Sequence, residues 1–204
     1  GLFHVVNAPV RKVMRFSSFG DLLLLLYDPS LNPEPVGLAE RGPRRARSRL
    51  LGDLGRIAAD SQGTIYVQER LPAGSEQTDD AVTRAHIVRR FDPTGADQGY
   101  LGREGMEGTP LGFVHRLVVT DQDDLVVVTR EVGVWEVFWF DAQGLLKLRR
   151  RIVVEELSRS GSDLRLNEIA AVIADPTGPP QLLIEAIVQA EGRSEIWQLD
   201  GDGI

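Results

Sequence analysis

One turn recurs along this chain at a fixed distance from an apolar residue, and it constrains the fold more than any other feature. Segments 11–20, 85–95, 133–144 and 193–203 each end in a glycine, and an apolar residue stands four positions before it. The glycines are Gly20, Gly95, Gly144 and Gly203, and the apolar residues are Phe16, Phe91, Phe140 and Leu199. Three of the turns open with an aspartate, namely Asp92, Asp141 and Asp200. Aspartate at the start and glycine at the end are typical of a type I turn, so each segment predicts a strand that enters a hairpin.

A second series of turns comes before the first series. Segments 56–67, 116–128 and 171–184 each consist of an apolar strand, a turn with an aspartate and a second apolar strand. The aspartates that align as first turn residues are Asp60, Asp121 and Asp175. The repeating unit is therefore four strands, named a to d, with similar short turns between a and b and between c and d.

The repeat divides the chain into four parts. We expect strands b, c and d of one unit over 3–27, complete units over 56–101 and 114–154, and strands a, b and c of another unit over 168–199. Three longer connections, 28–55, 69–84 and 155–167, are expected to be inserted loops. No segment shows a sustained helical period, which favours antiparallel four-stranded sheets.

Apolar side chains lie on both faces of the expected strands. Along 134–140, Trp135, Val137 and Trp139 share one face, while Phe138 and Phe140 share the other. Sheets with two apolar faces must be covered on both sides, as they are when four-stranded sheets stack around an axis. We therefore predict an all-β fold, a β-propeller of four-stranded antiparallel blades with about four blades or part-blades. Residues 1–204 form a single propeller domain or a fragment of one in this prediction.

The stretch 99–129 resembles the NHL repeat of six-bladed propellers. The matching residues are Gly102, Gly105, Gly108, Pro110, Val118 and Asp121, although Arg130 and Glu131 replace the family's usual segment after strand b. The opening stretch 12–33 also resembles uncharacterised spirochaete lipoproteins that carry such a propeller. These resemblances imply a location in the bacterial cell envelope, on the periplasmic side, and a lipid anchor outside this chain. They imply no activity.

Composition disfavours several function classes. The chain has no cysteine, three dispersed histidines and a net charge of −7, so we expect no catalytic residues, metal site or cofactor and consider nucleic acid an improbable partner. Its longest apolar run, Leu22–Tyr27, is far shorter than the ~20 residues of a membrane span, and the chain carries no targeting signal. A blade takes ~40–45 residues. Six blades would therefore need more residues than the 204 of this chain, so we expect further blades or a second chain to close the ring.

The long connections predict a binding face. All three belong to the rim that carries the b–c and d–a connections, and insertions on one face of a repeat protein often mark its binding face. The candidate binding residues are Arg41, Arg44, Arg45, Arg47 and Arg49 in the arginine-rich segment, Glu69 and Arg70 at the start of 69–84, and Arg130 after strand b. The predicted function is a non-enzymatic scaffold that binds a protein or an envelope component. The alternatives are a metal-dependent hydrolase of the lactonase type and a binder of anions or lipid surfaces through 41–49.

Overall fold

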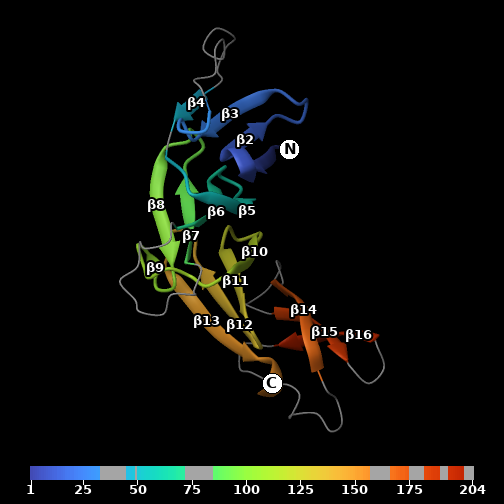
Figure 1. The fold of residues 1–204 in the computed structure, drawn as a ribbon. Helices are drawn as coiled ribbons and strands as arrows, with labels where there is room; N and C mark the ends of the chain where they lie inside the picture. Colours follow the sequence, from blue (N-terminus) through green and yellow to red (C-terminus); the bar gives the residue numbers. More distant parts are fainter. Residues whose placement is uncertain are drawn as a thin grey trace. The chain divides into compact units, whose positions relative to one another are not determined.

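The chain divides into two compact units, residues 1–112 and 113–204, and each unit is described by itself. The structure is a computed structural model, and it describes residues 1–32, 45–48, 50–71, 85–156, 166–174, 182–188 and 193–199. Nearly all regular structure within these residues is β-strand (Figure 1). The prediction that 1–204 form a single domain stays a prediction.

Unit 1 contains two sheets. The first sheet has the order β1–β2–β3–β4, formed by β1 (Phe3–Asn7), β2 (Lys12–Phe16), β3 (Leu22–Tyr27) and β4 (Arg45–Ser48). A 3-10 helix, η1 (Ala8–Val10), connects β1 to β2. The second sheet is formed in order by β5 (Asp53–Ala59), β6 (Ile65–Arg70), β7 (His86–Phe91), β8 (Asp97–Gly102) and β9 (Gly105–Met106). All neighbouring strands are antiparallel except β3 and β4, which are parallel.

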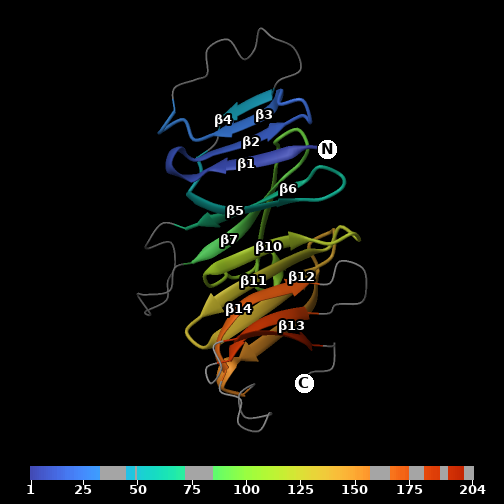
Figure 2. The ribbon, with the colours of Figure 1, turned by 90° about the vertical axis from the view of Figure 1, so that its right-hand side faces the viewer.

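The two sheets of unit 1 pack against each other, and Figure 2 shows β1–β4 above β5–β7. Val13, Leu24 and Leu26 of the first sheet form one buried cluster with Ile65, Val67, Phe91 and neighbouring residues of the second. Burial of these aliphatic side chains is the main force that holds the sheets together, because each fully buried side chain contributes roughly 1.5–3 kcal/mol.

Unit 2 also contains two sheets. Its first sheet has the order β10–β11–β12–β13, formed by β10 (Val114–Val119), β11 (Leu125–Glu131), β12 (Val134–Phe140) and β13 (Leu146–Val153). The second is formed by β14 (Leu166–Ala174), β15 (Leu182–Val188) and β16 (Arg193–Leu199). In β12, Trp135 and Trp139 on one face and Phe138 and Phe140 on the other are all buried, so both faces of this sheet are covered as predicted. Arg149 to Arg151 lie on β13, an edge strand of the sheet.

The short turns are built alike. Residues Ser17, Asp60, Asp92, Thr120 and Asp141 open five of them, and each accepts at its carbonyl the N–H of the residue three positions later. Their side-chain oxygens also accept the N–H four positions later. The residue three positions after the opening residue has a positive φ in every case, and it is a glycine in four of the five turns. The repeated hairpins and sheets confirm the predicted fold class: the described residues are nearly all β and, apart from the parallel strand β4, form antiparallel propeller blades, some of them partial. Asp175, Asp200 and Gly203 lie outside the described residues.

The predicted alignment of one turn is wrong by one residue. Thr120, not Asp121, opens the β10–β11 turn, because its hydroxyl accepts the N–H groups of Gln122 and Asp124. The register agrees, since Val119 pairs with Leu125 as Ala59 pairs with Ile65. Asp123 then occupies the left-handed position, with φ +60°, that glycine holds in the other turns.

The prediction that the whole segment 28–55 is a loop is also wrong. Residues 45–48 form β4, which pairs with β3 from Leu24 to Tyr27, and β5 begins at Asp53. Backbone hydrogen bonding does not depend on side-chain polarity, so an arginine-rich segment can form an edge strand as readily as an apolar one. Strand β4 thereby covers one edge of the leucine-rich strand β3.

Candidate functional site

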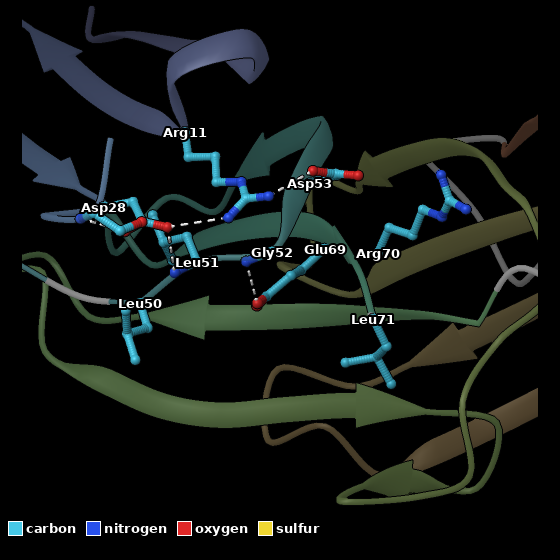
Figure 3. A pocket seen from close by; sticks show the side chains of 10 residues that line it. Arg11, Asp28, Leu50, Leu51, Gly52, Asp53, Glu69, Arg70 and Leu71 are labelled. Atoms are coloured by element: carbon cyan, nitrogen blue, oxygen red, sulfur yellow. Dashed lines mark hydrogen bonds and ion pairs between the residues drawn. The ribbon is translucent and has the colours of Figure 1, made fainter. Parts of the chain in front are cut away.

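A pocket of about 400 Å³ lies at one rim of unit 1, where β3 and β6 end and β2 and β5 begin (Figure 3). These strand ends belong to the b–c and d–a connections, so the pocket lies on the rim predicted to bind. Its charged lining residues are Arg11, Asp28, Asp53, Glu69 and Arg70. The remaining lining residues are Ser30, Leu50, Leu51, Gly52 and Leu71.

Arg11 connects two strand ends across the pocket. Its Nη1 donates to Oδ2 of Asp28 at 3.3 Å and its Nη2 donates to Oδ1 of Asp53 at 2.9 Å. The hydrogen bond to Asp53, together with the bond to Asp28, raises the pKa of Arg11 above its ordinary value. The Arg11 backbone is left-handed, with φ +48°, because it ends η1 and donates its N–H to the carbonyl of Ala8. This conformation is uncommon for residues other than glycine, and it directs the side chain toward both carboxylates.

Asp28 is the buried anchor of the pocket, with 1% of its surface exposed. Its carboxylate accepts the hydroxyl of Ser30 at 2.6 Å and the backbone N–H groups of Ser30 and Leu51 at 2.9 and 3.4 Å. Hydrogen bonds from Ser30, followed by those from Arg11 and Leu51, lower the pKa of Asp28 although burial opposes them. The carboxylate is therefore ionised at neutral pH and holds the chain after β3 against the start of β5.

Glu69 fixes the opposite wall of the pocket. One carboxylate oxygen accepts the N–H of Gly52 at 2.7 Å, and the other accepts Nε of Arg89. A Cβ on residue 52 would lie 2.4 Å from the carbonyl oxygen of Arg70, so only glycine allows the chain before β5 to approach the end of β6 this closely. Glu69 is 5% exposed and belongs to the rigid frame of the pocket.

Arg70 and Arg130 occupy equivalent places in their blades. Each is the sixth residue of strand b, and each pairs with a ring-bearing residue on strand c: Arg70 with His86, and Arg130 with Trp135. The Arg130 guanidinium lies 5.1 Å from the centre of the buried Trp135 ring, a cation–π contact within unit 2. Arg70 is exposed and lines the pocket of unit 1.

The predicted binding arginines do not form a single site in the described structure. Arg47 lies on β4 and donates to the carbonyl of Thr94 at 2.9 Å, which places it beside the β7–β8 turn and not at the pocket. The side chain of Arg45 lies outside the described residues, as do Arg41, Arg44 and Arg49. Of the predicted residues, Glu69 and Arg70 are therefore the pair brought together in the pocket.

The sequence did not predict that Arg11, Asp28 and Asp53 line a pocket. The ion pair between Arg11 and Asp53 spans 42 positions, and no local spacing indicates it. The turn at Asp28 could have been predicted. The sequence Asp28-Pro29-Ser30 is typical of a turn in which the aspartate accepts the N–H two residues later.

Comparison with known proteins finds similarity in structure alone, since no family model and no curated protein matches the chain. A protein of unknown function from Bacteroides caccae aligns with 96% of this chain and 57% of its own, at 14% identity and a TM-score of 0.44. The Dos1 propeller aligns with 98% of this chain and 43% of its own, at 12% identity and a TM-score of 0.44. The chain thus spans about half the length of either structure.

Two further observations concern only the described part of the chain. No three histidine, aspartate or glutamate side chains gather there in a way that could hold a metal ion. No helix in the same residues is long and apolar enough to cross a membrane.

Proposed function

We propose that this chain is a binding scaffold that holds a protein partner at the long-loop rim of its blades. The observation that carries the proposal is the pocket at that rim, which combines exposed Leu50 and half-buried Leu71 with a frame of fixed charges. Leu50 is 75% exposed, and an aliphatic side chain exposed this far beside a pocket is suited to contact with a partner.

The internal bonds of the pocket favour binding over proton transfer. Asp28 and Glu69 are held by hydrogen bonds from the backbone and from arginines, so their positions are set before any ligand arrives. Such preorganisation reduces the entropy lost on binding. The lowered pKa of Asp28 keeps this carboxylate ionised, whereas a general acid needs a pKa near the working pH.

The test compares two matched charge substitutions in the full chain. Leu50→Glu alters the pocket, while Leu145→Glu alters a similarly accessible leucine, 66% exposed, beside the β12–β13 turn of unit 2. Each tagged variant is used to capture partners from the native cell extract, and the captured proteins are quantified. We expect Leu145→Glu to retain the proteins bound by the wild type and Leu50→Glu to lose them. Equal retention by both variants would contradict the proposal.

We further propose that the scaffold works at the bacterial cell envelope and is related to NHL-repeat propellers. The support is the resemblance of 99–129 to the NHL repeat and of 12–33 to spirochaete lipoproteins. Fractionation of the native cells tests the location. Recovery in the envelope fraction is expected, and recovery with the cytosolic proteins would overturn this part of the proposal.

A further inference from the structure

The charged residues that line the pocket in unit 1 are three carboxylates and two arginines. Its three carboxylates are all engaged: Asp28 and Asp53 bind Arg11, and Glu69 binds Arg89. Arg70 is the remaining charged lining residue, and it forms no ion pair with the residues that the structure describes. Each carboxylate therefore already has an arginine partner, although Asp28 and Asp53 share one, and the guanidinium of Arg70 is open to an anion.

Arg130, the residue of unit 2 that is equivalent to Arg70, has a partner within its own sheet. Arg130 lies over the ring of Trp135, which is its partner on strand c. In unit 1 the partner on strand c is His86, which is buried to 97% of its surface, and no such ring contact holds Arg70. The guanidinium of Arg70 thus keeps its donors for a ligand, and its planar fork suits a carboxylate.

The accessible lining also includes two leucines, beside the exposed carboxylate of Asp53. In Figure 3, Leu50 and Leu71 lie toward opposite ends of the pocket, and the side chain of Arg70, which precedes Leu71 in the chain, points away from Leu50. An aliphatic side chain of a ligand would bury Leu50, and that burial is favourable because it removes apolar surface from water. A volume of about 400 Å³ is within the range of small-ligand pockets.

From these observations we infer that the pocket binds an acidic-aliphatic peptide segment of the partner, with a glutamate or aspartate carboxylate on Arg70 and neighbouring aliphatic side chains on Leu71 and Leu50. This inference rests on the proposed function, because it assumes that the ligand is a protein.

The test uses short capped peptides and the full chain. Acetyl-Gly-Glu-Leu-Leu-Gly-amide is titrated into the isotope-labelled protein and followed by the backbone amide signals of Gly52, Asp53 and Leu71. The same peptide with glutamine or lysine in place of glutamate supplies the charge controls. We expect the glutamate peptide to shift these signals and to bind about fivefold more tightly than the glutamine peptide, as for a partly exposed ion pair.

A charge exchange makes the test specific for residue 70. Arg70→Glu should abolish the preference for the glutamate peptide and create one for the lysine peptide, whereas Arg151→Glu, an exposed arginine on β13, should change neither. Equal binding of the glutamate and glutamine peptides would overturn the inference, as would a preference that ignores the charge of residue 70. Octanoate is titrated in parallel, and stronger shifts with octanoate than with the peptide would assign the pocket to fatty acids instead. If capture of the partner depends on Leu50 but not on the charge of residue 70, the proposed function stands and this inference falls.

Discussion

At the scale of single residues, Asp28 and His4 show how hydrogen bonding can favour the charged form of a side chain and how burial can favour the neutral form. Asp28 is buried as a carboxylate that accepts bonds from Ser30, Leu51 and Arg11. His4 is half-buried on β1 opposite Arg15, and its Nε2 has no hydrogen-bond partner among the described residues. The first group is stabilised in its charged form and the second in its neutral form.

Replacement of Asp28 by asparagine should lower the free energy of unfolding by about 2 kcal/mol at neutral pH, because hydrogen bonds to a charged group are lost. The lowered pKa means that the stability due to Asp28 is present above pH 3.8 and is lost as the pH falls through its folded value. Urea unfolding as a function of pH measures both effects. Asp53→Asn is the matched control, since this carboxylate is 63% exposed and should cost less than about 1 kcal/mol. Equal losses for the two variants would contradict the assignment of Asp28 as the anchor.

His4 should make the protein less stable in mild acid. Burial, and then the charge of Arg15, lower the pKa of His4 from 6.5, so the unfolded chain binds the proton more readily than the folded chain. The free energy of unfolding is therefore expected to fall as the pH drops below 6.5 toward the lowered folded value. Unfolding curves between pH 7.5 and 5 should show a smaller decrease for His4→Gln than for the wild type. Parallel curves for the two proteins would show that another group is responsible.

At the scale of elements, the turns that join paired strands explain both the regularity of the fold and its sensitivity to mutation. Gly20 and Gly95 close equivalent turns with φ of +85° and +80°. They differ in surroundings: a Cβ at residue 20 would meet no atom within 4 Å, whereas a Cβ at residue 95 would lie 2.7 Å from the Leu26 side chain.

This difference separates backbone strain from steric overlap. Gly20→Ala should cost about 1–2 kcal/mol, the strain of a left-handed residue with a side chain. Gly95→Ala carries the same strain and also displaces Leu24 or Leu26, so we expect it to cost about 1–3 kcal/mol more. Thermal unfolding of both variants measures the difference. An equal loss of stability would mean that the β7–β8 turn does not pack on β3 as described.

The same elements show what the sequence could and could not predict. The turns were predictable because the opening oxygen and the closing glycine are local requirements of the backbone. Asp121 was misaligned because threonine and aspartate accept the same hydrogen bonds, and only strand register distinguishes Thr120. Strand β4 escaped prediction because its pairing with β3 joins residues about 20 positions apart and leaves no period in the arginine-rich sequence. The pocket depends in the same way on Arg11 meeting Asp53, a contact that no spacing encodes.

At the scale of the whole molecule, equivalent positions in different blades differ in exposure. Phe3 on β1 pairs with Phe16 as Ile65 on β6 pairs with Phe91, so the two residues are equivalent. Ile65 is fully buried against the first sheet, whereas Phe3 is 60% exposed. The stacking of sheets, not the hydrophobicity of the residue, therefore decides which side chains contribute most to stability.

Truncation of these two residues measures the contribution of stacking. Ile65→Ala should lower the free energy of unfolding by about 3 kcal/mol, because it removes buried methyl groups and leaves a cavity. Phe3→Ala, although it removes a larger side chain, should cost about 1 kcal/mol, because most of its surface is already in contact with water. Denaturant unfolding of both variants provides the comparison. A greater loss for Phe3→Ala would contradict the stacking of the second sheet on the first.

The packing of one blade on the next is tested most directly by nuclear Overhauser effects between methyl groups in unit 1. The methyl groups of Val13, Leu24 and Leu26 lie in one buried cluster with those of Ile65 and Val67, although the two sets belong to different sheets. With selectively labelled methyl groups, we expect cross-peaks that connect the first set to the second. If cross-peaks occur within each sheet but none connects the two sheets, the stacked-blade description of this chain is wrong.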